Sequence, residues 1–114
     1  GAKNVDWEDL SSDGDFLYIG DIGNNRNQRK NLMVYRAPIN DLFPYYIDGE
    51  LNHNFPDTIV AEHYPLNYPD QMSFPPKMSQ MNFDSEALTC ADGKLLILSK
   101  DRSKPYKVYV KFMR

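Results

Sequence analysis

Cysteine is nearly absent from this chain of 114 residues. Cys90 is the only one, so the chain forms no disulfide within itself and builds no site that needs several thiolates. The surrounding text "EALTCADGK" offers no histidine to act as a base for a catalytic thiol. We therefore expect Cys90 to be a small buried residue of a strand.

An excess of basic residues and a long apolar run are also missing. The formal net charge is −3, whereas binding to a phosphate backbone requires a basic surface. Nucleic acid is therefore not an expected partner. No run approaches the roughly 18 consecutive apolar residues of a transmembrane helix, so no membrane span is expected.

Histidine is scarce too, with His53 and His63 as the only two. No Gly-x-Ser-x-Gly motif supplies a nucleophile for a histidine to activate. A Ser-His-Asp mechanism is not expected, and we interpret His63, next to Tyr64, as a surface residue of a strand.

Aromatic residues and proline are abundant instead. Aromatics make up 13% of the chain, and it contains eight tyrosines and eight prolines, a composition that favours sheets and rigid turns over helices. The length suits one modest domain.

Several short segments have the pattern of strands between turns. "FLYIG" at 16–20 is a continuous apolar run, which predicts a strand buried on both faces. "LMVYRAPI" at 32–39 predicts a second strand whose pairing ends at Pro38, with a polar loop between the two. "LLIL" at 95–98 and the alternating "YKVYVKFM" at 106–113, with its lysines outward, predict two more.

The middle of the chain is less regular. Asn40 or Asp41 is expected to cap a single helical turn, followed by a turn at Asp48–Gly49. A strand is expected from Thr58 to Tyr64. Residues 67–81, rich in Pro, Met and aromatics, are interpreted as an irregular insertion that packs on the rest.

The two halves of the sequence repeat one pattern. "NVDWEDL" matches "NFDSEAL" at a constant offset of 78 residues. With one inserted residue, Asp13–Gly14 then matches Asp92–Gly93, and Val34–Tyr35 matches Val108–Tyr109. Repeated units of antiparallel strands joined by tight turns are typical of β-propeller blades.

The predicted fold class is therefore all-β, with antiparallel β-propeller-like blades. Residues 1–66 form the first blade-like repeat, 67–81 the insertion, and 82–114 a second, incomplete repeat. Closed propellers need roughly four to eight blades, so about two blades make a partial propeller or a fragment, whose open sheet edges need cover. The alternative is a small sheet or sandwich built from a duplicated meander.

Acidic residues recur at the start of each repeat: Asp6 and Glu8, then Asp84 and Glu86. Simple alternation puts Asp6, Glu8 and Leu10 on one face and Trp7 and Asp9 on the other. Carboxylates that converge on a channel repel one another, and a hard cation, calcium before magnesium, would neutralise them. The alternative is that the aspartates accept backbone N–H bonds and that each glutamate pairs with an arginine or an amide.

The loop "GDIGNN" adds Asp21 as a third kind of candidate. It lies by a glycine turn and two asparagines, although the ligand spacing and terminal Glu of an EF-hand are absent. The expected metal ligands are Glu8, Asp21 and Glu86, followed by Asp6 and Asp84.

Taken together, "DWEDL", "YIGDIGNN" and "NFDSEAL" resemble secreted or cell-surface bacterial propeller proteins, a group related to phytase-like, esterase-like and NHL/SMP-30-like propellers. The resemblance implies a propeller fold, an extracytoplasmic location, and calcium at a channel-end site of Glu8, Asp21 and Glu86. Where such propellers have a known activity, it is hydrolytic and metal-assisted.

Two functions follow as expectations. The first is a propeller-like binding or scaffold domain of a secreted or cell-envelope bacterial protein, stabilised by calcium. The second is a metal-dependent hydrolase of phosphoesters, lactones or other esters, in which Glu8 and Glu86 hold a cation that activates water. The expected partner is a ligand or protein of unknown identity. Self-association through open sheet edges, or further blades in a longer chain, would complete the ring.

Overall fold

A computed structural model describes residues 3–41, 46–47, 49–51, 59–103 and 109–113 of the chain. Within these residues the protein is all-β with antiparallel pairing, as predicted, and its only helices are two single 3-10 turns, η1 (Ile39–Asp41) and η2 (Met78–Gln80). Neither turn has the length or the apolar character needed to cross a membrane.

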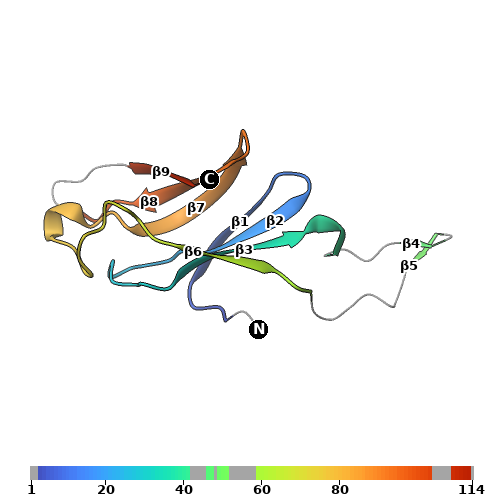
Figure 1. The fold of residues 1–114 in the computed structure, drawn as a ribbon, viewed down its shortest axis with the longest axis horizontal. Coiled ribbons are helices and arrows are strands. Elements are labelled where there is room, and N and C mark those ends of the chain that lie inside the picture. Colours follow the sequence, from blue (N-terminus) through green and yellow to red (C-terminus); the bar gives the residue numbers. More distant parts are fainter. Residues whose placement is uncertain (1–2, 42–45, 48, 52–58, 104–108, 114) are drawn as a thin grey trace.

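The first sheet has four strands whose order in space follows the chain (Figure 1). They are β1 (Trp7–Ser12), β2 (Phe16–Asp21), β3 (Leu32–Pro38) and β6 (Glu62–Leu66). Each strand pairs antiparallel with the next. Such a meander needs only short connections between β1, β2 and β3, and the turn and loop residues around Asp13 and Asn24 supply them.

Two details of the first sheet correct the sequence analysis. The fourth strand runs from Glu62 to Leu66 rather than from Thr58 to Tyr64, and Val60 before it is 89% exposed. Pairing begins where Glu62 lies opposite Arg36, to which it is ion-paired. The "FLYIG" strand is not buried on both faces: residues 16–19 are half-buried, because the second sheet covers only one face of β2.

A small hairpin follows η1 and lies apart from both larger sheets (Figure 1). It consists of β4 (Tyr46–Ile47) and β5 (Glu50–Leu51). Gly49 between them has φ +81°, a left-handed conformation that suits glycine. This agrees with the predicted turn, of which Asp48 lies outside the described residues. A single helical turn is present near the predicted place as η1, but it begins at Ile39, so Asn40 and Asp41 lie within it rather than cap it.

The second sheet has three strands: β7 (Asp84–Ala91), β8 (Lys94–Lys100) and β9 (Tyr109–Met113). Asp92 and Gly93 join β7 to β8 with φ values of 48° and 70°, the conformation that a two-residue hairpin turn prefers. The side chains of the closing strand, on which the lysine alternation was predicted, lie outside the described residues.

The strand registers show that the two sheets repeat each other more closely than the sequence alignment implied. Leu10 lies opposite Ile19, and Leu88 lies opposite Ile97. Both strands of the hairpin therefore keep the same offset of 78 residues, without the inserted residue that matching the Asp-Gly pairs required. By the same reasoning, Val34 corresponds to Val110 rather than to Val108, since these residues lie opposite Gly20 and Leu98.

A β-bulge occurs at the same position in both copies. The pairing of β1 with β2 shifts between Trp7 and Asp9, and that of β7 with β8 shifts between Ser85 and Ala87. Glu8 and Glu86 are thus the extra residues of two equivalent bulges, which re-aim the side chains around them. The bulge also overturns the predicted alternation, because Trp7 and Leu10 now share a face; the Trp7 ring lies 6.3 Å from that of Tyr35.

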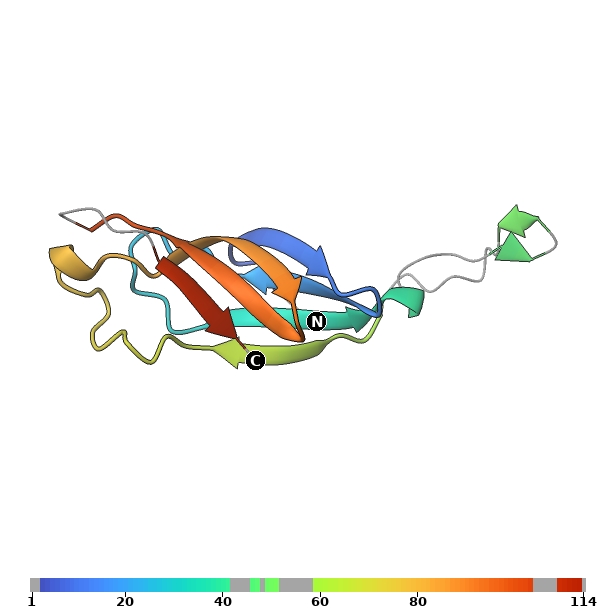
Figure 2. The same ribbon diagram turned by 90° about the horizontal axis from the view of Figure 1, so that it is seen from above.

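The second sheet packs over one face of the first, with β7 beside β1 (Figure 2). Between them lies a core of fully buried side chains drawn from both sheets and from the connecting segment. Its members are Ile22, Leu32, Leu66, Tyr68, Phe83, Leu88 and Ile97. The 67–81 segment packs on the rest through Tyr68 and Gln71, as expected, while its Met72 and Met78 are exposed.

Replacing Ile97 by Ala should lower the free energy of unfolding by about 2–5 kcal/mol, because it removes a fully buried side chain between two sheets that cannot both collapse into the gap. Val60→Ala, at an exposed valine, should change it by less than about 0.5 kcal/mol. Equilibrium denaturation in urea measures both. Equal effects of the two substitutions would contradict the packing described.

Candidate functional site

The predicted acidic residues come from two strands that lie side by side. Asp6 and Glu8 stand at the start of β1, and Asp84 and Glu86 at the start of β7. Asp6, Glu86 and Asp84 all act electrostatically on Glu8. These four carboxylates therefore lie in one region of the molecule, and the metal-ligand role expected of them stays a prediction.

Gly23 is the residue that lets Asp6 and Glu8 lie so close to the loop after β2. A Cβ at this position would overlap the Asp6 carboxylate and lie 2.7 Å from Glu8 Oε1. Any side chain at Gly23 would therefore push the acidic residues away. This is a packing requirement for glycine, not a requirement for positive φ.

The pKa of the Glu8 carboxyl is raised above its ordinary value of 4.5. The largest cause is partial removal from water, and the neighbouring charges of Asp6 and Glu86 add to it. The ionised form of Glu8 is consequently less favourable in the folded chain than in the unfolded one.

Asp21 has a different environment from the other candidates. Its side chain is 2% exposed and ion-paired with Arg29 at 3.0 Å. Its two oxygens also accept the backbone N–H groups of Val5, at 3.3 Å, and Asp6, at 2.9 Å. The Asp21 carboxylate thus holds the start of β1 against the end of β2.

Asp84 and Glu86 also have partners within the chain. Asp84, fully buried, accepts the Asn24 N–H at 2.7 Å and Arg102 Nε at 3.2 Å. Glu86 pairs with Lys100 at 3.3 Å on the surface. The bond from the Asn24 N–H to Asp84 is of the kind expected under the alternative to a metal site, whereas Glu86 pairs with a lysine rather than with the expected arginine or amide. Among the residues that the structure describes, no three Asp, Glu, His or Cys side chains are grouped so as to hold a metal ion, and calcium stays a prediction of the sequence.

The loop after β2 joins the two sheets through buried asparagines. Asn24 donates from Nδ2 to the Phe83 carbonyl at 3.0 Å. Asn27 accepts the Phe83 N–H at 2.6 Å, and its own carbonyl accepts Gln71 Nε2 at 2.7 Å. Asn27 has φ 53°, a left-handed conformation that asparagine tolerates better than most residues. We call this set of contacts, together with those of Asp9 and Asp84, the inter-sheet joint.

Asp9 contributes to the inter-sheet joint from the bulge of β1. Its Oδ2 accepts the N–H of Leu88 in the other sheet at 2.8 Å, while its Oδ1 accepts the N–H of Leu10 at 2.8 Å. One carboxylate therefore satisfies equivalent amides in both repeats. Asn27 and Asp9 were not among the predicted site residues; the signals available were that Asp9 has Ala87 as its equivalent in the second copy and that Asn27 follows the "GDIGNN" loop.

Tyr68, in the segment that connects the two sheets, also contacts the inter-sheet joint. Its hydroxyl is hydrogen-bonded to the Ser85 hydroxyl, and its ring lies 5.3 Å from that of Phe83. Burial raises the pKa of Tyr68 to about 12, so the hydroxyl is neutral throughout the physiological range.

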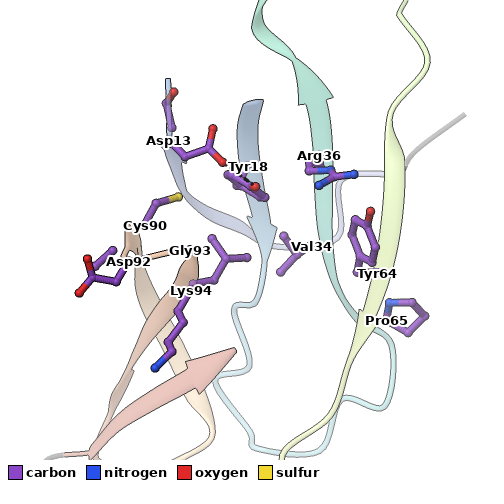
Figure 3. A pocket seen from close by; sticks show the side chains of 13 residues that line it. Asp13, Tyr18, Val34, Arg36, Tyr64, Pro65, Cys90, Asp92, Gly93 and Lys94 are labelled. Carbon is purple, nitrogen blue, oxygen red and sulfur yellow. Dashed lines mark hydrogen bonds between the residues drawn. The ribbon is translucent and has the colours of Figure 1, made fainter. Parts of the chain in front are cut away.

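A cleft of about 720 Å³ opens beyond the joint, between the β7–β8 turn and the first sheet (Figure 3). Tyr18, Arg36 and Tyr64 line one wall, and Cys90 and Lys94 line the other. Arg36 has partners within the chain: it pairs with Glu62, at 3.0 Å from Nε, and its guanidinium lies 4.2 Å from the Phe16 ring centre. The Tyr18 hydroxyl donates to Asp13 at 2.9 Å.

The structure also places Cys90 and His63, for which the sequence predicted strand positions. Cys90 lies in strand β7 as predicted, but it is half-buried at the wall of the cleft rather than fully buried. His63 is an exposed residue of β6, which confirms its interpretation. His53 lies outside the described residues.

No family model, curated protein or solved structure matches this chain.

Replacing Asn27 by Ala should lower the free energy of unfolding by about 1–3 kcal/mol, because the buried Phe83 N–H loses its acceptor. Asn25→Ala in the same loop is the matched control, since Asn25 is exposed and makes one 3.3 Å bond to Arg102. Thermal or urea unfolding measures the difference. If Asn25→Ala costs as much as Asn27→Ala, the loop does not act through its buried asparagines.

Replacing Glu8 by Gln should stabilise the chain at pH 7 in the presence of a chelator, because it removes a charge that the folded state disfavours. A raised pKa in the folded state means that the cost is present above that raised pKa and vanishes below the unfolded value near 4.5. The advantage of Glu8→Gln should therefore shrink as the pH falls from 7 to 4. Unfolding across this range tests it, with Glu50→Gln as control; a pH-independent difference would show that Glu8 is not strained by its neighbours.

Proposed function

We propose that this chain is a propeller-like binding and scaffold domain in which the two sheets are consecutive blades. The observation that carries the proposal is the inter-sheet joint. Equivalent strands, with equivalent bulges and an offset of 78 residues in both ladders, are locked together by buried side-chain bonds to backbone groups. Repeat architectures stack in this way, each unit burying the face of the next.

The chemistry of the described side chains supports a scaffold more than a reaction. Arg36, Asp21 and Asp84 each have partners inside the chain. Their role is to position backbone and neighbouring strands. No observation on the described residues favours the hydrolase alternative, so we do not develop it.

The location that accompanies this proposal, in a secreted or cell-envelope bacterial protein, rests on the resemblance of "DWEDL", "GDIGNN" and "NFDSEAL" to bacterial propellers. The single half-buried cysteine is compatible with such a compartment, because it needs no partner thiol.

If the sheets are stacked units, they should unfold together. The chain offers one natural probe for each: Trp7, its only tryptophan, in the first sheet, and Cys90, its only cysteine, in the second. Trp7 fluorescence and pulsed thiol labelling of Cys90 should give the same urea midpoint. In Asp9→Ala both midpoints should fall together, by an amount equivalent to about 1–3 kcal/mol, because the Leu88 N–H loses its acceptor across the joint.

Asp15→Ala is the control for that experiment, since Asp15 is an exposed acidic residue of the adjacent hairpin turn. It should leave both midpoints in place. Separate midpoints for Trp7 and Cys90 in the unmodified chain would contradict the proposal, because they would show two sheets that fold independently.

A further inference from the structure

The second sheet packs on the first through one of its faces. The equivalent face of the first sheet is not covered by the second sheet. Phe83, Leu88 and Ile97 are buried to 4% exposure or less against the first sheet. Their equivalents, 78 residues earlier, are Val5, Leu10 and Ile19. Val5 is 55% and Leu10 is 62% exposed, while Ile19 is half-buried. We call Val5, Leu10 and Ile19 the head face.

The second sheet in turn has an open face, which is equivalent to the face of the first sheet that it covers. In the first sheet Tyr18 and Gly20 face the second sheet, and a Cβ on Gly20 would lie 3.4 Å from the Leu88 side chain. Their equivalents by strand register are Leu96 and Leu98, on the side of β8 opposite to buried Ile97. Leu98 is 40% exposed and Leu96 half-buried. We call Leu96 and Leu98 the tail face.

The contact between the two sheets has two sides, and each side occurs twice in the chain. One copy of each side is covered in the contact within the chain, and the other copy is uncovered as the head face or the tail face. Large exposed apolar side chains gathered on a sheet face indicate an interaction surface. The basic residues after the tail face, Lys100 and Arg102, are already ion-paired with Glu86 and Asp84 in the same chain, so the apolar side chains of the two faces carry the contact.

We propose that the head face of one copy of this chain docks on the tail face of a second copy, in the arrangement that relates the two sheets within one chain. This inference rests on the proposed function, because it treats the sheets as equivalent stacking units. The contact is one of matching apolar character rather than identical packing, since Leu98 replaces Gly20 and brings more apolar surface to it.

Such a contact joins two different surfaces, so each copy keeps one head face and one tail face free for further copies. A head-to-tail contact closes into a ring when its rotation permits, and otherwise gives a filament. With two sheets per copy, a ring of the size found in closed propellers needs about two to four copies.

The test uses two variants, each of which blocks one face with a buried charge: Leu10→Asp on the head face and Leu98→Asp on the tail face. Both positions are exposed in the single chain, so far-UV circular dichroism should show a native fold. Analytical ultracentrifugation of the unmodified chain should show assemblies of two or more copies. Either variant alone should sediment as a single chain, and an equimolar mixture should form complexes of two chains and no larger ones.

Any of three results would overturn the inference. The unmodified chain could stay a single copy at every concentration tested, a variant alone could still self-associate, or the mixture of the two variants could form no complex. Self-association of Leu98→Asp alone would indicate a head-to-head contact instead. Val5→Asp serves as a second head-face variant if Leu10→Asp does not fold. A chain that is a single copy yet shows coincident Trp7 and Cys90 transitions would refute the docking alone and leave the proposed function intact.

Discussion

The backbone amides along the outer edge of β7 are the constraint on which the rest of the structure depends. β7 pairs with β8 on one side only, so the N–H groups of Leu88 in β7 and of Phe83 just before it need acceptors from elsewhere in a partly dry environment. Asn27 and Asp9 provide them, from a loop and a bulge that belong to the first sheet. The second sheet is therefore fixed to the first by directed bonds as well as by apolar contact, and the core around Ile22 and Ile97 fills the space that those bonds define.

This constraint also explains how acidic residues came to gather at the joint. Asp9, Asp21 and Asp84 each accept backbone N–H groups, and a carboxylate is the strongest acceptor that a side chain offers for that task. The cost is mutual repulsion, which Arg29 and Arg102 relieve for Asp21 and Asp84. Glu8 is left with the residual strain, as the raised pKa of its carboxyl shows.

Much of the fold could be predicted from the sequence, because its signals are local or repeated. The apolar runs located β2, β3 and β8 closely, and the repeat identified equivalent strands. The bulges at Glu8 and Glu86 could not be foreseen, since a bulge depends on which residues lie opposite across the ladder. They moved Trp7 to the same face as Leu10. The inserted residue in the sequence alignment has another cause, because the two Asp-Gly pairs occupy different positions in their turns.

The bonds of the candidate site residues could not be predicted from the sequence. Asp6, Glu8, Asp84 and Glu86, which the repeat singled out, lie close enough for their charges to act on Glu8. The partners of Asp21 and Asp84 come from residues 8 to 60 positions away, such as Arg29 and Asn24, and no spacing rule connects them. Asn27 escaped notice for the same reason, because its importance lies in a left-handed backbone conformation and in a distant amide.

Native-state hydrogen exchange of the Phe83, Leu88 and Asn24 amides tests the central claim most directly. These N–H groups lie outside the regular ladders and donate to side chains across the joint. If the joint holds the two sheets as one unit, they should exchange only through global unfolding, with protection equal to that of the Ile97 amide in the middle of β8. Exchange at the rates of exposed loops while Ile97 stays protected would contradict the account, because it would show that the sheets separate without unfolding.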